Sequence, residues 1–345
     1  MQYTKRALGC MYGQVIGDSL GSRYEFQSAS VVQRMITDDL VQSFLPIIGG
    51  GPLQLLPGQE KFEDIAAKKT SKSLPLRKSL IRCGAFNAAN VACSYVFWSQ
   101  SKPPDIGNAT RNALTIERQL SPNWHDELSD IEKEAVHREI LNNVRNYNVG
   151  SLSNGCLMRI SPLAIHSINM PIERVEEMVR TDCSLTHCEE DAKQAVFSYV
   201  IAIRHLLNGN SNKEAFEVAL KSTKSMRIRE HLLTAQEKPV PVNIGDQFVN
   251  GDGKAMGYIG VALQSAFYEL LHGISFTKSL VDAISRGGDT DTNGAIVGAL
   301  LGARFGIDDV PEKWISTMKK SKPRANFNTI DYNIERIVNK LLIMS

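Results

Sequence analysis

The sequence lacks the cysteine pattern of a disulfide-rich or zinc-ribbon protein. Its six cysteines are scattered among apolar residues and form no CxxC pair. This spacing favours buried free thiols in a reducing compartment. Only Cys183, His187 and Cys188 lie close enough together to suggest zinc. They offer three ligands on one short stretch without a second half, so zinc is the less favoured interpretation.

The sequence also lacks a charge bias and a long apolar run. Lys plus Arg number 39 against 37 Asp plus Glu, which leaves a net charge of +2. Such a balance provides no general attraction to nucleic acid or to an anionic membrane. No uncharged apolar run reaches the length of a membrane span, and the N-terminal apolar stretch before Asp18 is too short and glycine-rich for a signal peptide. We therefore expect a soluble, cytoplasmic, monomeric protein.

Two local runs depart from this even balance. Residues 68–82 carry six basic residues and no acidic one, and a second basic run covers residues 319–324. Runs of this kind are usually solvated faces of a folded protein, so we interpret both as surface rather than as a nucleic-acid site.

Helical periodicity dominates the chain, and 43% of its residues are hydrophobic, enough for a large core. Apolar residues recur at three- and four-residue steps, whereas sustained two-residue alternation is absent. We predict helices at 173–180, 190–207, 259–272 and 276–284. Loops are expected at 49–52, 102–105, 150–155 and 238–253. None of these loops resembles an interdomain linker, so we predict one all-α domain over residues 1–345.

Glycine recurs every fourth residue in two places. The two stripes are Gly9, Gly13, Gly17, Gly21 and Gly294, Gly298, Gly302, Gly306. Because a glycine inside a helix costs about 1 kcal/mol relative to alanine, four in register imply a compensating gain, normally the close approach of another helix. In a membrane the same spacing would favour dimerisation, but Asp18, Arg23 and Arg304 argue against lipid. We predict two central helices; whether their stripes face each other stays open.

Small oxygen-bearing side chains stand immediately before the second stripe, in Gly287-Gly288-Asp289-Thr290-Asp291-Thr292. Helix capping would explain one of them but not four in a row. Asp289, Asp291 and the hydroxyl of Thr292 could supply three oxygen ligands to Mg²⁺ or Mn²⁺ from one turn. Gly287 and Gly288 would let the backbone approach a ligand closely.

The first stripe also carries acidic residues. Asp18 lies inside it, and Glu25 follows seven residues later on roughly the same helical face. Taken alone, each is as consistent with a structural role as with a functional one.

These motifs together resemble those of the ADP-ribosylglycohydrolases. The resemblance rests on an opening motif, a mid-chain segment and a closing motif, in order from residue 7 to about residue 307. They are Gly17-Asp18-Ser19-Leu20-Gly21 with Glu25-Phe26, Ser153-Asn154-Gly155-Cys156-Leu157-Met158-Arg159, and Gly288-Asp289-Thr290-Asp291-Thr292-Asn293-Gly294. Thr186-His187, Gly257-Tyr258 and Trp98 with Pro104-Asp105-Ile106-Gly107 match further landmarks.

The resemblance implies an all-α fold with a magnesium or manganese centre beside an ADP-ribose cleft. It further implies hydrolysis of the N- or O-glycosidic bond between ADP-ribose and a protein or other acceptor. Carried onto this sequence, the resemblance implies that Asp289, Asp291 and Thr292 would be metal ligands and that Glu25 and Asp291 would be catalytic. The substrate-binding residues would be Asn154, Gly155, Met158, His187, Tyr258, Gly287 and Gly288.

The sequence departs from the family at one motif, where Pro-Gly should be followed by Thr-Asp-Asp-Thr. In the gapless register Lys61, Phe62 and Glu63 replace the expected Thr, Asp and Asp. A shifted register instead places Glu63 and Asp64 at the carboxylate pair and keeps a second metal site. A lysine beside that site would exclude the cation, which leaves open a catalytically impaired relative that binds ADP-ribose or a partner protein. Alternatively, 60–64 merely begin a helix with favourable acidic residues.

Overall fold

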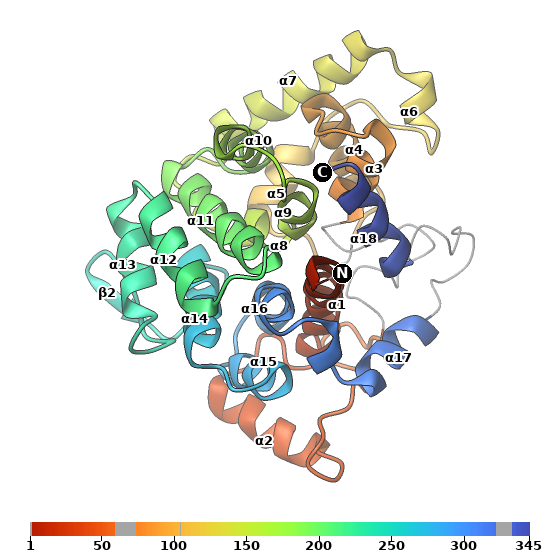
Figure 1. The fold of residues 1–345 in the computed structure, drawn as a ribbon. Helices are drawn as coiled ribbons and strands as arrows, with labels where there is room; N and C mark the ends of the chain where they lie inside the picture. The colour runs from red at the N-terminus through yellow and green to blue at the C-terminus, as the bar shows by residue number, and fades with distance from the viewer. Residues whose placement is uncertain (1, 59–73, 104, 322–332) are drawn as a thin grey trace.

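The computed structural model describes residues 2–58, 74–103, 105–321 and 333–345, and helices dominate them (Figure 1). The N-terminal helices are α1 (Gln2–Gly21), α2 (Ala29–Asp39), α3 (Leu74–Cys83), α4 (Ala88–Gln100), α5 (Asn108–Leu114), α6 (Trp124–Glu127), α7 (Asp130–Tyr147), α8 (Gly155–Met158) and α9 (Ser161–His166). The remaining elements are α10 (Ile172–Ser184), α11 (Glu190–Leu207), α12 (Asn212–Ser222), α13 (Met226–Thr234), β1 (Val242–Ile244), β2 (Gln247–Val249), α14 (Ile259–His272), α15 (Phe276–Ser285), α16 (Thr290–Phe305), η1 (Ile307–Asp309), α17 (Glu312–Lys320) and α18 (Ile334–Ile343). The all-α prediction is confirmed.

The helices predicted from periodicity are all present. Those predicted at 190–207 and 259–272 have the bounds of α11 and α14, while α10 and α15 extend slightly beyond the other two predictions. Two loop predictions need correction. The segment 238–253 contains the antiparallel hairpin β1–β2, with Asn243 paired to Phe248, and Gly155 begins α8 rather than ending a loop. The division of the chain into one domain stays a prediction.

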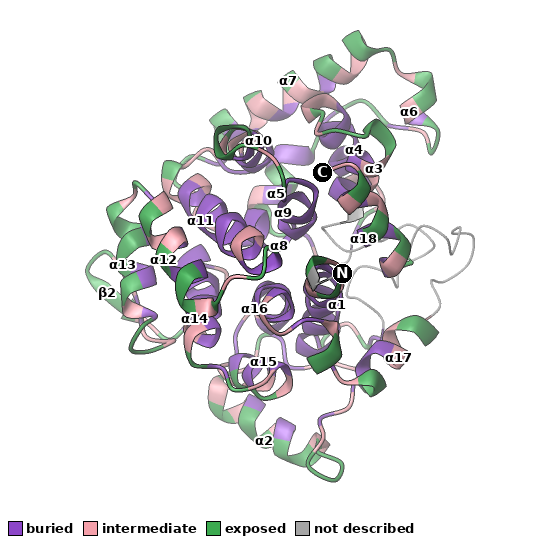
Figure 2. Cartoon of the chain, viewed as in Figure 1, coloured by how far each residue is buried: buried purple, intermediate pink, exposed green. Residues whose placement is uncertain are grey.

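The helices α1 and α16 lie side by side and antiparallel at the centre of the molecule, and both are largely buried (Figures 1 and 2). Their glycine stripes face each other. A Cβ atom added to Gly13 would lie 2.0 Å from the carbonyl oxygen of Gly298, and one added to Gly17 would lie 2.0 Å from that of Gly294. Since real Cβ atoms do not approach within 3.0 Å, only glycine permits this spacing. The structure therefore shows that the two glycine stripes face each other, which the sequence left open.

Other helices surround this central pair. α11, α14 and α15 pack on α16, and α9, α11 and α18 pack on α1. The hydroxyl of Tyr199 on α11 donates a hydrogen bond to the carbonyl of Ile296 on α16 (2.7 Å), which fixes their spacing. The pair therefore lies at the centre of the helices that contact it.

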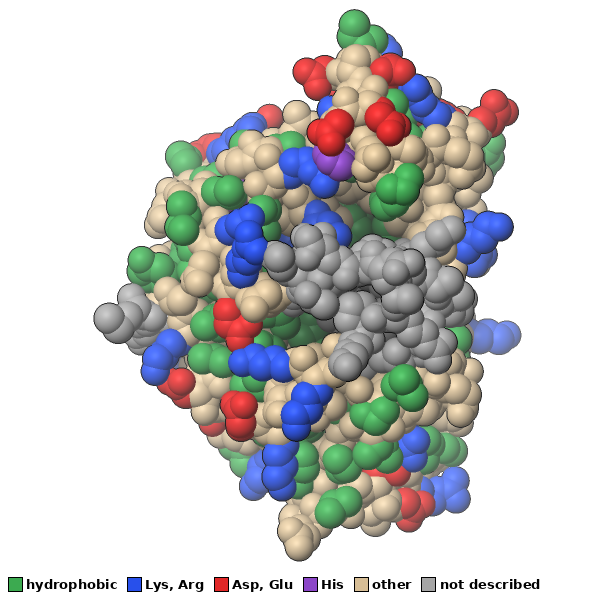
Figure 3. Space-filling model, turned by 90° about the vertical axis from the view of Figure 1, so that its right-hand side faces the viewer, with side chains coloured by type: hydrophobic (Ala, Val, Ile, Leu, Met, Phe, Trp, Pro, Cys, Tyr) green, Lys and Arg blue, Asp and Glu red, His purple; other side chains and the backbone are tan. Residues whose placement is uncertain are grey.

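The basic runs are less uniform than the sequence suggested. Within the first run, Arg77 on α3 is 2% exposed, so it belongs to the core and not to a solvated face. Lys319 on α17 pairs with Glu335 on α18 at 2.8 Å, in keeping with a surface helix. On the face that lies at the right of Figure 1, basic, acidic and apolar side chains are interspersed around the grey atoms (Figure 3).

Among the described residues no helix has the length and apolar character needed to cross a membrane.

Candidate metal centre and ligand site

Three carboxylates from opposite ends of the chain meet beside the central helix pair. Glu25, Asp289 and Asp291 each offer an oxygen, and these oxygens all lie within 4.8 Å of one another. Glu25 and Asp291 are buried, and Asp289 is partly exposed. Carboxylates held this close repel one another where water is scarce, and a divalent cation would relieve that repulsion. These carboxylates form a candidate metal-binding group. Asp289 and Asp291 were predicted as ligands and Glu25 as a catalytic residue, and their roles stay predictions.

The facing glycine stripes bring these carboxylates together. Because α1 and α16 are antiparallel, the last turn of α1 lies against the first turn of α16. The Thr290 hydroxyl donates a hydrogen bond to the carbonyl of Gly21 across that junction (2.7 Å). Glu25 follows Gly21 in the turn after α1, and Asp291 lies in the first turn of α16. Helix packing along the whole stripe therefore decides the spacing of the acidic group.

The first turn of α16 holds the two aspartates in different ways. Asp289 is the N-cap residue, and its carbonyl accepts a hydrogen bond from the Asn293 N–H (2.9 Å). One oxygen of Asp291 accepts a hydrogen bond from the Thr292 N–H (2.7 Å). The positive end of the helix dipole stabilises negative charge at both positions. Thr292 itself is 4% exposed and adjoins the group through this contact.

The Gly287-Gly288 pair connects the segment before α16 to the segment that follows α1. Gly288 accepts a hydrogen bond from the Phe26 N–H (2.8 Å) and donates its own N–H to the carbonyl of Gln27 (2.9 Å). Both glycines have positive φ, 75° and 77°, and a Cβ on Gly288 would lie 2.0 Å from the Gly251 carbonyl oxygen. The visible role of these glycines is therefore a tight backbone junction beside Glu25, and their contact with a substrate stays a prediction.

Asn154 is the predicted substrate residue that reaches the acidic group directly. Its side-chain amide donates a hydrogen bond to a carboxylate oxygen of Asp289 (2.8 Å), and its backbone N–H donates to the carbonyl of Gly257 (2.9 Å). The amide thereby fixes the orientation of the Asp289 carboxylate, which is the role that outer-shell partners have in metal sites. The sequence contained no signal for this bond, because the two residues lie far apart along the chain.

His187 is fully buried, and both of its ring nitrogens are engaged by hydroxyl groups. Its Nε2 lies 2.7 Å from the Ser153 oxygen, and its Nδ1 lies 2.8 Å from the Thr186 oxygen. In the part of the chain that the structure describes, Cys183, His187 and Cys188 are not brought together as a metal-binding group, in keeping with the less favoured status of zinc. His187 instead supports the segment that carries Asn154, and a direct contact with substrate stays a prediction.

Tyr258 lies at the start of α14 and pairs with a histidine that the sequence did not single out. The Tyr258 hydroxyl lies 2.9 Å from Nε2 of His231, whose ring packs edge-on against the tyrosine ring. Burial lowers the pKa of His231 to about 4, so the imidazole is neutral near pH 7, and burial raises the pKa of Tyr258 to about 12. Gly260 leaves the room for this pair, because a Cβ there would lie 2.4 Å from the tyrosine ring.

The remaining residues predicted to bind substrate lie in or beside α8. Gly155 and Met158 are both buried, and the Met158 carbonyl accepts a hydrogen bond from the Gln14 side chain on α1 (2.5 Å). This bond ties α8 to the central helix. Glu63 and Asp64, predicted as metal ligands, lie outside the described residues, as does the altered motif from Gln59 onward.

Comparison with known proteins identifies the fold and the lineage. Residues 1–344 match the ADP-ribosylglycohydrolase family. The chain belongs to this family. Among solved structures, it superimposes on a chain of an ADP-ribosylglycohydrolase-related protein complex with a TM-score of 0.69, 22% identity and 99% coverage of both chains. The family and the fold class predicted from the sequence are thereby confirmed.

Relatives with assigned names span nearly the whole chain. The ADP-ribosyl-[dinitrogen reductase] glycohydrolase of Rhodospirillum rubrum is 26% identical over 329 residues, which cover 94% of each chain. The ADP-ribosylhydrolase ARH3 of Homo sapiens is 24% identical over 340 residues, covering 90% of this chain and 88% of the relative. A putative ADP-ribosyl glycohydrolase of Acanthamoeba polyphaga mimivirus is 28% identical over 327 residues, covering 91% of this chain and 90% of the relative.

Proposed function

We propose that the protein is a metal-dependent ADP-ribosylglycohydrolase, which hydrolyses the N- or O-glycosidic bond between ADP-ribose and a protein or other acceptor. The observation that carries this proposal is the group formed by Glu25, Asp289 and Asp291, whose oxygens lie within 4.8 Å in a member of this family. A site built of carboxylate oxygens suits Mg²⁺ or Mn²⁺ better than zinc, which favours nitrogen and sulfur ligands. The charge balance and scattered thiols support a cytoplasmic enzyme.

The residues at the site would have different roles in the reaction. Glu25, Asp289, Asp291 and the hydroxyl of Thr292 would hold the cation. A bound divalent cation would supply a Lewis acid that polarises oxygens and lowers the pKa of a bound water. Glu25 approaches from a different segment than the aspartates, and it is buried, so it is suited to take a proton from water or return one to the leaving group. Asp291 is held in place by the Thr292 N–H.

The ADP-ribose moiety would lie against the segments that converge on Asp289. Asn154 and Gly155 approach from one side, and Gly287 and Gly288 precede Asp289 along the chain. Tyr258 begins α14, and Met158 and His187 lie behind the Asn154 segment. The Asn154 bond to Asp289 supports this arrangement, because it places the proposed nucleotide-binding segment against the proposed metal ligands.

The proposal is tested with purified protein, an ADP-ribosylated acceptor and Mg²⁺ or Mn²⁺, with release of ADP-ribose as the readout. Glu25→Gln and Asp291→Asn should each lower kcat about a hundredfold or more, the usual contribution of a positioned acid or base. Asp246→Asn is the matched control, because Asp246 is an exposed aspartate in the β1–β2 turn, outside the carboxylate group. Absence of release from arginine-, serine- and nucleic-acid-linked ADP-ribose by folded, metal-loaded protein would exclude the hydrolase.

A second candidate function rests on the altered motif at residues 57–64. A chain with Lys61 and Phe62 in place of metal ligands would retain ADP-ribose binding without catalysis. This relative would bind ADP-ribose with at most one divalent ion for each chain. Calorimetry with Mn²⁺ distinguishes the two candidates, since two tightly bound ions together with ADP-ribose release support only the hydrolase.

A further inference from the structure

A cavity of about 350 Å³ lies between α7, α10 and α11, and it shares no lining residue with the carboxylate group. Its polar wall carries three cationic side chains, Arg145, Arg180 and Lys193, together with the ring of His137. Leu141 and Val144 supply an apolar wall, and no described Asp or Glu lines the space. Its volume is at the lower end of the range for small-molecule sites.

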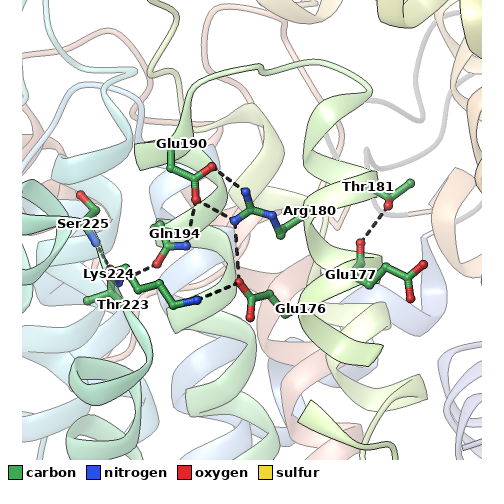
Figure 4. Close-up of polar contacts among 9 residues, drawn as sticks. All are labelled: Glu176, Glu177, Arg180, Thr181, Glu190, Gln194, Thr223, Lys224 and Ser225. Atoms are coloured by element: carbon green, nitrogen blue, oxygen red, sulfur yellow. Dashed lines mark hydrogen bonds and ion pairs between the residues drawn. The ribbon is translucent and has the colours of Figure 1, made fainter. Parts of the chain in front are cut away.

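Arg180 already has its charge balanced. Its guanidinium makes two hydrogen bonds of 2.7 Å to the Glu190 carboxylate and lies 3.7 Å from Glu176 (Figure 4). Lys224 lies 3.9 Å from the same Glu176 carboxylate. This network fixes one rim of the cavity and leaves little of the charge of Arg180 for a ligand.

Arg145 and Lys193 differ from Arg180 because neither forms an ion pair or side-chain hydrogen bond with any part of the chain that the structure describes. They belong to different walls, Arg145 to the last turn of α7 and Lys193 to the first turn of α11. Arg145 is exposed, and Lys193 is partly exposed and interacts electrostatically with Glu190, whose carboxylate already pairs with Arg180. Two cations that face one cavity repel each other. An anion bound between them would relieve this repulsion.

His137 adds a further polar group that the fold leaves unused. Its Nδ1 lies 3.2 Å from a Glu134 oxygen, whereas its Nε2 is buried and has no hydrogen-bond partner among the described residues. Buried ring nitrogens normally find a partner. A ligand in the cavity would provide one.

We propose that this cavity is a second binding site, which takes a small phosphate monoester. Arg145 and Lys193 would contact the phosphate from opposite walls, and the apolar part of the ligand would lie against Leu141 and Val144. The two cations, neither of which has an ion pair or side-chain hydrogen bond among the described residues, match the double negative charge of such a phosphate. The inference does not depend on the hydrolase activity.

The test is calorimetric titration of the full-length protein with phenyl phosphate, at fixed ionic strength and with EDTA to keep metal from the carboxylate group. Arg145→Ala and Lys193→Ala should each weaken binding about tenfold or more, because each removes a charged contact. Arg138→Ala on α7 and Lys213→Ala on α12 are the matched controls, since both remove a cation outside the cavity and should leave the affinity unchanged.

Three outcomes would overturn the proposal. The first is the absence of saturable binding by the unaltered protein. The second is an equal loss of affinity in the two controls, which would indicate general charge attraction. The third is binding that is retained unchanged in Arg145→Ala and Lys193→Ala, which would place phenyl phosphate outside this cavity.

Discussion

The contact between the glycine stripes makes a specific prediction for Gly13→Ala. The added Cβ would lie 2.0 Å from the Gly298 carbonyl oxygen and 2.7 Å from its carbonyl carbon, and both are backbone atoms. Ordinary contact begins at 3.4 Å, so relief of the overlap requires α1 and α16 to separate locally by 3.4 − 2.0 = 1.4 Å. No side-chain rotation can avoid this movement.

The magnitude follows from two opposing effects. Alanine favours a helix over glycine by about 1 kcal/mol. Overpacking in a core costs about 1 to 3 kcal/mol, occasionally more, and a clash between two backbones belongs at the upper end of that range. We therefore expect the free energy of unfolding of Gly13→Ala to fall by about 2 kcal/mol. Since the same helix pair sets the distance between Glu25 and Asp291, Mn²⁺ affinity should fall as well.

Urea unfolding measures the first effect, and calorimetric Mn²⁺ titration of the folded variant measures the second. Gly107→Ala is the control, because Gly107 precedes α5 with an ordinary φ and nothing lies within 4 Å of its added Cβ. The control should lower the free energy of unfolding by at most about 1 kcal/mol, because alanine is a poorer N-cap residue than glycine but meets no clash, and it should leave Mn²⁺ affinity unchanged. Unchanged stability and Mn²⁺ affinity in Gly13→Ala, or an equal loss in Gly107→Ala, would refute the packing argument.

Three further predictions follow from buried polar groups. Burial lowers the pKa of His231 to about 4, whereas the unfolded value is about 6.5, so only the unfolded chain gains a proton as pH falls from 6.5 to 4. Between pH 7 and pH 5 the free energy of unfolding should therefore fall by about 2 kcal/mol more in the unaltered protein than in His231→Gln, measured by urea unfolding at both pH values. An equal pH response in the two proteins would contradict this. Asn154→Ala should weaken Mn²⁺ binding about 10- to 100-fold in calorimetry, because Asp289 loses the amide that orients it; an unchanged affinity would show that the amide does not orient Asp289. In the unaltered protein the buried Arg159 guanidinium lies 3.1 Å from the Asp182 carboxylate. Asp182→Ala removes this counterion and should lower the free energy of unfolding by about 3 to 5 kcal/mol. A loss below about 1 kcal/mol in thermal or urea unfolding would exclude an uncompensated buried charge.

The sequence predicted some of the site because its signals are local. The run Asp289 to Thr292 occupies one turn, so the spacing alone places its oxygens near one another. Glu25 gave a weaker signal, since an isolated acidic residue after a helix has many uses. Its distance from the aspartates depends on the packing of α1 against α16. Asp18, equally acidic and buried in the stripe, is not part of the carboxylate group found among the described residues.

Other parts of the site had no local signal at all. Three contacts join residues from different segments of the chain. They are the hydrogen bond of Asn154 to Asp289, the pairing of His231 with Tyr258 and the contact of buried His187 with Ser153. For Arg77 the local sequence gave a wrong signal, because a basic run indicates a solvated face only on average. Its burial on α3 depends on which side of the helix faces the core.

By itself, the sequence determined the most strongly periodic helices, the two glycine stripes and the carboxylates before the second stripe, because periodicity and glycine propensity act within a few residues. The tertiary structure alone decided that the stripes face each other. Only that contact carries Glu25 to within 4.8 Å of Asp289 and Asp291. The physical reason is that the distance between residues at opposite ends of a chain is set by how closely two backbones can pack, and here glycine sets that limit.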